Sequence, residues 1–248
     1  MTTWPGVVLA IALVLPAGCA GSGRMRGPVG FRAPVLTGSG HIQVTVDVWA
    51  RMSSASGAIA VTARAADDVP HLMRVIQHDG MPRSGPVDLV YVVDTTNSMR
   101  DDIGAAKAQM RAILGDLTQW NPDRRVGIVA YRDRGDPYVA MVVLPLAFDE
   151  GIILAGIDGL RVKGGGDLRE HVYAGLHTAL HEQPWRPGAS HHIILIGDAP
   201  PHEDYGDDPR NQRSVLADAA RPDLAVKIHT ITAYCDKECQ QALAEDGR

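Results

Sequence analysis

Three clusters of oxygen-bearing side chains could hold a divalent cation. The first, Asp94-Thr95-Thr96-Asn97-Ser98, follows a short apolar run. The second is Asp167, which comes after three consecutive glycines, and the third is Asp198, just after another apolar run. Carboxylate and hydroxyl oxygens are hard donors, which suit Mg²⁺, Mn²⁺ or Ca²⁺ better than zinc.

The elements around these clusters follow an alternating strand and helix pattern. The Val-rich run 87–93 is typical of a buried parallel strand, and the apolar stripe through 99–117 predicts a helix after it. Further strands are expected at 126–131, within 138–148, at 192–196 and at 226–232, and further helices at 149–160, 168–181, 210–220 and 236–245. The turn 133–137 is short enough to make its two strands antiparallel. We therefore predict a doubly wound, mostly parallel α/β sheet with helices on both faces.

Ligands of such sheets bind at the carboxyl ends of the strands. All three clusters fall on that edge. Together they can supply most of the ligands of a cation and leave one position open for an oxygen from a partner.

The sequence resembles the von Willebrand factor type A domains from Val87 to about the C-terminus. The segment DTTNS matches their D-x-[ST]-x-S motif. The segments GGGD with Glu170, GDAPPH at 197–202 and AYRD at 130–133 resemble a bacterial and alpha-kinase-associated branch of that family. Domains of this family carry a metal-ion-dependent adhesion site.

This resemblance implies a role for each of the five residues. Thr96 and Ser98 would coordinate the metal through their hydroxyls, and Asp94 and Asp198 would act largely through water. Asp167 would take the place that a Thr often holds in adhesion-type members. Each residue also has a plainer interpretation: Ser98 as a helix cap, Asp167 with Glu170 as a capping box, and Asp198 as a turn residue.

The chain departs from the family pattern in three places. Leu168-Arg169 replace a small residue and Pro after the loop aspartate, and Gly197 replaces a Thr. We expect a domain at 87–248 that lacks the last strand and helix of the family. The segments on either side of Ser53–Gly57 alternate apolar and polar residues, so we predict a β-hairpin within 41–65 that replaces the missing sheet edge, followed by a linker up to 86.

The N-terminus predicts export. The apolar run 7–15 is too short to span a membrane and ends in small residues, which is typical of a signal peptide over 1–19. Cys19 follows Ala-Gly, as in the lipobox of bacterial lipoproteins, and this resemblance implies a lipid anchor at Cys19. The alternative is cleavage near Ala20 with loss of Cys19. Residues 20–40 are rich in Gly, Pro and Ser and predict a flexible tether.

Two other spacings are compatible with chemistry. Cys235 and Cys239 could form a disulfide across one helical turn in an oxidising compartment, or be half of a metal site. His177 and His181 share one helix face, but the sequence offers no third ligand beside them. We expect these two histidines to be solvated or partly buried.

The composition limits the classes of function that the protein can have. The 248 residues carry a net charge of -5 and only 5% aromatic residues, which excludes a general nucleic-acid binder. We predict a non-enzymatic, envelope-anchored binding module that uses a divalent cation, Mg²⁺ before Mn²⁺ or Ca²⁺, to engage an acidic group on a protein partner. One alternative is a metal-dependent hydrolase that uses His202 and Glu203. The other is a metal-free structural subunit.

Overall fold

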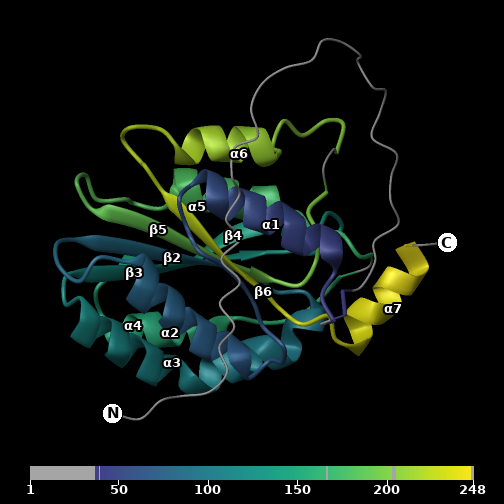
Figure 1. Cartoon of the computed structure of the whole chain (residues 1–248), viewed down its shortest axis with the longest axis horizontal. Helices are drawn as coiled ribbons and strands as arrows, with labels where there is room; N and C mark the ends of the chain where they lie inside the picture. Colours follow the sequence, from purple (N-terminus) through teal and green to yellow (C-terminus); the bar gives the residue numbers. More distant parts are fainter. Residues whose placement is uncertain (1–36, 39, 166, 203–204, 247–248) are drawn as a thin grey trace. The chain divides into compact units, whose positions relative to one another are not determined.

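The fold is built on one six-stranded sheet with the order β1-β6-β5-β2-β3-β4 (Figure 1). A computed structural model describes residues 37–38, 40–165, 167–202 and 205–246. The predicted signal peptide, Cys19 and Glu203 lie outside the described residues, as does the predicted tether except for Thr37, Gly38 and Gly40. The strands are β1 (Ala60–Thr62), β2 (Val87–Asp94), β3 (Arg124–Tyr131), β4 (Ala140–Ala147), β5 (Ser190–Gly197) and β6 (Lys227–Thr232). Only β4 is antiparallel to its neighbour, as the short turn before it predicts.

Helices cover both faces of this sheet (Figure 1). They are α1 (Gln43–Ala55), α2 (Asp68–Gly80), α3 (Arg100–Trp120), α4 (Glu150–Gly159), α5 (Val172–Glu182), α6 (Gln212–Ala219) and α7 (Lys237–Asp246), with a short 3-10 turn, η1 (Asn97–Met99), before α3. One apolar layer holds α2, α3 and α4, and the other holds α1, α5 and α6. The predicted doubly wound, mostly parallel fold is confirmed.

Strand β2 lies inside the sheet, between β5 and β3, and all of its residues are buried. Leu89 and Tyr91 pack into the layer of α3, while Val90 and Val92 pack into the layer of α5. Successive side chains of a strand point to opposite faces, so a strand covered on both sides reads as a continuous apolar run. This burial holds the loop after Asp94 in one position.

The prediction of a β-hairpin within 41–65 is wrong. Its first half forms α1, whose buried residues recur at helical spacing: Thr45, Val48, Trp49, Met52 and Ser53. The alternation of valines in 44–48 is also compatible with a helix over so short a stretch. Burial of the large Trp49 and Met52 side chains against the sheet then favours the helical period. The second half does form an edge strand, β1, which pairs parallel with β6. The predicted linker up to 86 is also wrong over most of its length, because it contains α2, whose Val69, Met73 and Ile76 are buried against the core.

Helix α5 starts later than the sequence predicts. It begins at Val172 rather than near Leu168, because Glu170 makes an isolated parallel bridge to Pro201. The backbone N–H of Glu170 donates to the carbonyl of Pro200 at 3.1 Å. The segment 168–171 is thereby tied to the loop after β5.

Among the described residues, none of the helices is long and apolar enough to span a membrane.

Candidate metal centre

The centre lies where β2 and β5 end side by side. These strands pair in parallel with Val93 opposite Ile196, so the loops that follow them leave from the same edge. Asp94 ends β2 and is fully buried, and Asp198 follows β5 and is 1% exposed. Two carboxylates from distant parts of the chain are therefore buried next to one another.

The hydroxyls of the first loop link the two aspartates. The backbone N–H and the Oγ1 of Thr96 donate to Asp94 Oδ1 at 2.9 and 2.7 Å. Ser98 Oγ donates to Asp198 Oδ1 at 3.2 Å and lies 3.4 Å from Thr96 Oγ1. The cap positions of η1 and α3 carry no side-chain hydrogen bond, so Ser98 is not a helix cap. Four of the five predicted residues thus form one hydrogen-bonded cluster.

The glycines before Asp167 let a third loop approach this cluster. Gly164 and Gly165 both have left-handed φ angles, +88° and +82°. The N–H of Asn97 donates to the carbonyl of Gly164 at 3.3 Å, and a Cβ on Gly165 would lie 3.2 Å from Thr96 Cβ. Larger residues here would push the loop away from Thr96.

Asp167 lies at the rim of the centre. Its side chain is 56% exposed, and its Oδ2 is 3.7 Å from His202 Nε2. The same histidine nitrogen lies 3.6 Å from Asp133 Oδ2, and Tyr205 donates its hydroxyl to Asp133. The rim therefore carries a His and two carboxylates from three separate loops.

Glu170 belongs to the buried group, although the sequence singled it out only as part of a motif or a cap. Its side chain is 2% exposed and lines the same cavity as Thr96, Ser98, Asp167 and Asp198. It cannot cap α5, which begins only at Val172. The signal that could have found it is its place three residues after the loop aspartate, in a segment that is otherwise close to a helix start.

The cavity between these side chains has a volume of about 90 Å³. At this centre, three buried carboxylate oxygens have no hydrogen-bond partner among the described residues: Asp94 Oδ2, Glu170 Oε2 and Asp198 Oδ2. Buried polar atoms are normally satisfied, because leaving them without a partner costs about 1–3 kcal/mol each. Glu170 and Asp198 line this cavity, and Asp94 is hydrogen-bonded to Thr96, which also lines it. A cation in the cavity would satisfy the oxygens of Glu170 and Asp198, and the donor set consists of the hard oxygens that divalent cations prefer. The residues present therefore fit such an ion.

The electrostatics of the centre agree with this fit. Burial raises the pKa of Asp94 to about 6, with the charge of Asp136 adding to the effect. Burial, followed by the charge of Asp94, raises the pKa values of Asp198 and Glu170 well above their ordinary range. Without a cation these groups favour their protonated forms, and a divalent charge beside them would favour the ionised forms.

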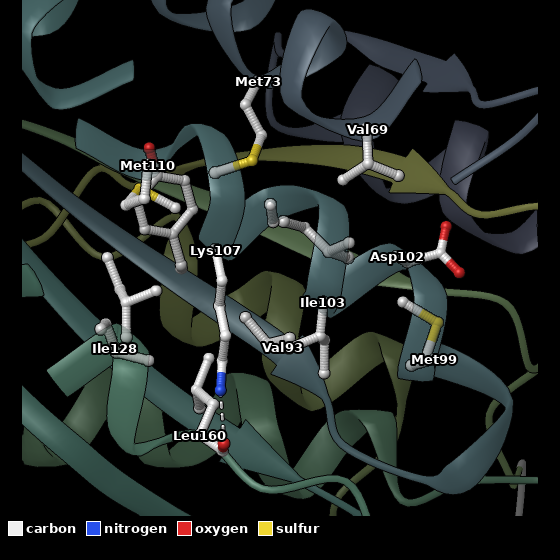
Figure 2. Close-up of a pocket in the computed structure, with 14 residues that line it drawn as sticks. Val69, Met73, Val93, Met99, Asp102, Ile103, Lys107, Met110, Ile128 and Leu160 are labelled. Carbon is white, nitrogen blue, oxygen red and sulfur yellow. Dashed lines mark hydrogen bonds between the residues drawn. The ribbon is translucent and has the colours of Figure 1, made fainter. Parts of the chain in front are cut away.

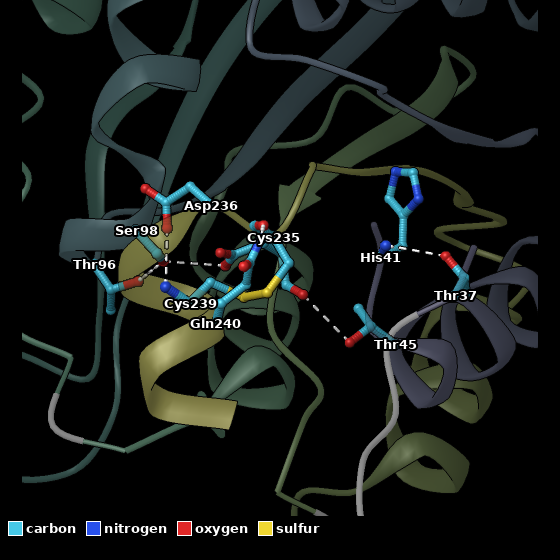
Figure 3. The surroundings of a disulfide bond; sticks show 10 residues. Thr37, His41, Thr45, Thr96, Ser98, Cys235, Asp236, Cys239 and Gln240 are labelled. Atoms are coloured by element: carbon cyan, nitrogen blue, oxygen red, sulfur yellow. Dashed lines mark hydrogen bonds between the residues drawn. A yellow bond between two sulfur atoms is a disulfide. The ribbon is translucent and has the colours of Figure 1, made fainter. Parts of the chain in front are cut away.

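Helix α7 borders the cavity. Cys239 and Ala242 contribute to its lining, and a disulfide joins Cys239 to Cys235 at the start of the helix. Figure 3 shows this disulfide beside Thr96 and Ser98. Leu168, a departure from the family pattern, packs in a small apolar cluster with both cysteines. That departure supports the position of α7 beside the centre.

The departure from the family pattern at Gly197 also has a structural cause. A Cβ on Gly197 would lie 2.6 Å from the hydroxyl of Tyr131 and 3.0 Å from Asp94 Cβ. A Thr at this position would therefore collide with two buried side chains.

A second cavity, under α3, is apolar (Figure 2). Its volume is about 30 Å³, room for one or two water molecules, and its lining includes Met73, Ile103 and Met110. Lys107 at its margin donates to the carbonyl of Leu160 at 2.7 Å. This cavity is too small for an organic ligand.

Comparisons with known proteins agree with this architecture. Residues 88–245 match the family model described as von Willebrand factor A domain. No curated protein matches the chain at a significant level.

Solved structures give weaker likenesses. The SpRpn10 VWA domain is 14% identical over 64% of this chain and 94% of that one, with a TM-score of 0.39. The open conformation of the pilus adhesin SpaC from Lactobacillus rhamnosus GG is 20% identical over 46% of this chain and 15% of that one, with a TM-score of 0.36. The structure of three N-terminal domains of the type V pili tip protein Mfa5 from Porphyromonas gingivalis is 22% identical over 46% of this chain and 20% of that one, with a TM-score of 0.36. The chain thus spans a fifth or less of the two pilus proteins, and these scores carry no functional argument.

Proposed function

Since the chain belongs to the von Willebrand factor A domain family, we propose that it is a binding module that uses a divalent cation to engage a protein partner. The cation, Mg²⁺ first, would be held where β2 and β5 end. The observation that carries the proposal is the group of three buried, unpartnered carboxylate oxygens at this sheet edge, two of which, from Glu170 and Asp198, belong to residues that line one cavity.

The hydrogen bonds leave the right atoms for a cation. Thr96 Oγ1 donates its proton to Asp94, and Ser98 Oγ donates its proton to Asp198. The lone pairs of both hydroxyls therefore remain for a metal. Asp94 Oδ1 is held by Thr96, which leaves Oδ2 for the metal or for a water molecule bound to it. Glu170 would add a further carboxylate, and Asp167 would act from the rim.

The charges explain why binding of a partner would depend on the metal. Three carboxyl groups line the cavity, those of Asp167, Glu170 and Asp198, so it offers no positive charge to an acidic group when no cation is bound. A bound cation with an open position attracts an anionic oxygen strongly at short range. We therefore assign the open position to an Asp or Glu side chain of the partner.

Export and lipid anchoring at Cys19 belong to the same proposal. The Cys235–Cys239 disulfide supports it, because disulfides persist mainly in oxidising compartments outside the cytosol. Replacement of the anchor residue, Cys19→Ser, is expected to move the protein from the membrane fraction to the soluble fraction. Unchanged fractionation would reject the anchor but leave the metal site untouched.

The metal site is tested by thermal denaturation in EDTA and then with Mg²⁺, Mn²⁺ or Ca²⁺. Binding to the folded state stabilises it by about 2.7 kcal/mol at a ligand concentration of 100 times Kd, so the Tm should rise. Asp94→Ala is expected to abolish the rise, whereas Asp101→Ala, at an exposed position nearby, should keep it.

Two other results would replace the proposal. The absence of any rise with all three ions would make the chain a metal-free structural subunit. Hydrolysis of a generic phosphate ester that is lost in both Asp94→Ala and His202→Ala would favour a metal-dependent hydrolase, since His202 lies at the rim beside Asp133 and Asp167.

A further inference from the structure

Two histidines on α5 lie outside the centre described above. His177 and His181 are one helical turn apart, and their ring centroids are 4.3 Å apart. Both lie beyond the first turn of the helix, about 8 and 14 Å along its axis from Val172 at 1.5 Å per residue. They are therefore well separated from the loops that end β2 and β5.

The structure supplies the third group that the sequence did not reveal. Helix α6 packs beside α5 and places Asp218 Oδ2 2.9 Å from His181 Nε2. One ligand-type atom from each of His177, His181 and Asp218 lies within 4.8 Å of the other two. The side chains of His181 and Asp218 are 32% and 31% exposed, so an ion from solvent can reach them.

We propose that His177, His181 and Asp218 form a separate zinc site that joins α5 to α6. Two imidazoles and a carboxylate are typical zinc ligands, whereas the hydroxyls and carboxylates at the sheet edge suit Mg²⁺. Tetrahedral zinc with bonds of about 2.1 Å holds its ligand atoms about 3.4 Å apart. The present separations therefore need side-chain movements on the order of only 1 Å. Three protein ligands leave a fourth position for water.

The surroundings support coordination. Burial, followed by the neighbouring charge of His181, lowers the pKa of His177, so its ring is neutral and able to bind a metal at pH 7. Arg210 lowers this pKa further, while Asp218 and Glu182 oppose the shift. The carboxylates thus offset the positive charge of Arg210 near the site.

Zinc binding would stabilise the region beside the sheet edge. Helix α6 follows the loop that carries His202 and Asp208, and Asp208 accepts a hydrogen bond from His171 at 2.8 Å. A metal joining α5 to α6 would hold the far end of α6. Zinc would therefore raise thermal stability independently of Mg²⁺.

Isothermal titration of the full chain with ZnCl₂ tests the proposal. The titration uses an Asp94→Ala/His202→Ala background, so that neither the sheet-edge centre nor the rim group of Asp133, Asp167 and His202 contributes. His177→Ala is the informative variant, because His177 takes no part in the His181–Asp218 hydrogen bond and its loss leaves that bond in place. Compared with the parent in the same background, His177→Ala is expected to bind one zinc ion fewer per chain, or to bind zinc at least about tenfold more weakly. The exposed His71→Ala on α2 is the matched control and should bind as the parent does.

The outcomes separate the two sites. Equal zinc stoichiometry and affinity in the parent and His177→Ala would overturn the proposal, as would an absence of zinc binding in the parent. If both sites exist, His177→Ala with Asp94 intact should keep the Tm rise with Mg²⁺, while His177→Ala in the titration background should lose zinc binding. Failure of Mg²⁺ binding with intact zinc binding would reject only the sheet-edge function.

Discussion

Strand β2 carries a buried aspartate near each end, and the two are held in opposite ways. The side chains of Asp88 and Asp94 are both 0% exposed. Asp88 accepts bonds from Arg125 at 2.6 and 3.0 Å and from the backbone and side chain of Arg186, both at 2.8 Å. Asp94 receives bonds only from Thr96, and its Oδ2 has no partner among the described residues.

Their pKa values diverge for this reason. Burial alone would raise both. At Asp88, hydrogen bonds and charges from Arg125 and Arg186 outweigh burial, so its pKa is lowered. At Asp94, burial prevails and raises the pKa to about 6. Burial of a carboxylate therefore does not mark a binding site by itself; Asp88 and Asp94 differ in whether both of their oxygens have a partner among the described residues.

The largest expected effect on stability is at Asp88, whose two carboxylate oxygens both accept hydrogen bonds. Asp88→Asn should destabilise the protein by about 2–4 kcal/mol, because Arg125 and Arg186 lose their shared counter-charge. Both arginines are partly exposed, at 13% and 22%, which keeps the loss below that of a fully buried pair. Urea denaturation in EDTA measures it.

The same change at the other end should behave differently. Asp94→Asn removes a buried charge that no basic side chain hydrogen-bonds among the described residues and whose burial outweighs the attraction of Arg132, so we expect a loss below about 1 kcal/mol, or a gain. Equal losses in Asp88→Asn and Asp94→Asn would contradict the comparison.

The pH dependence sharpens the contrast. The pKa of Asp94 is higher in the folded state than its ordinary value of 3.8, so the folded state binds its proton more tightly. The contribution of Asp94 to stability is then present at low pH and is lost as pH rises from about 4 to 6, a change on the order of 3 kcal/mol. Asp88 has a lowered pKa, so its contribution is present above pH 3.8 and is lost only below that value.

The measurement is the difference in unfolding free energy between the parent and Asp94→Asn, in EDTA, from pH 4 to 7. The difference removes the contributions of groups that do not interact with Asp94, such as His192 and His229. A difference that stays constant across this range would refute the raised pKa of Asp94. Saturating Mg²⁺ at pH 7 should restore the stability of the parent only.

The smallest effect concerns the loop that approaches Thr96. Gly165 and Gly85 have nearly identical φ angles, +82° and +83°, but their surroundings differ. A Cβ added at Gly165 would lie 3.2 Å from Thr96 Cβ, whereas a Cβ added at Gly85 would meet no described atom within 4 Å. Gly165→Ala and Gly85→Ala should each cost about 1 kcal/mol from backbone strain. Only Gly165→Ala should also reduce the Tm rise with Mg²⁺, because only there does the added Cβ press on Thr96. An equal reduction in Gly85→Ala would show that backbone strain alone explains the reduced Tm rise.

Several features could be predicted because they depend on neighbours in sequence. The strand β2 is readable because its burial on both faces requires an apolar run, and α3 because its stripe repeats over many turns. The positions of Asp94 and Asp198 follow from the strands that precede them. By contrast, the short alternation in 44–48 fits both a strand and a helix, and the contacts of Trp49 with the sheet decide between them.

From β2 onward, the sequence by itself determined the order of strands and helices, the sheet edge at which Asp94 and Asp198 meet, and the hard-oxygen character of these side chains. Tertiary structure decided which carboxylates are satisfied. Asp88 meets Arg186 across 98 positions, and His181 meets Asp218 across 37. Glu170 joins the centre only because its backbone bridges to Pro201. The physical reason is that the pKa and hydrogen bonding of a buried group depend on everything packed around it, and most of that comes from distant parts of the sequence.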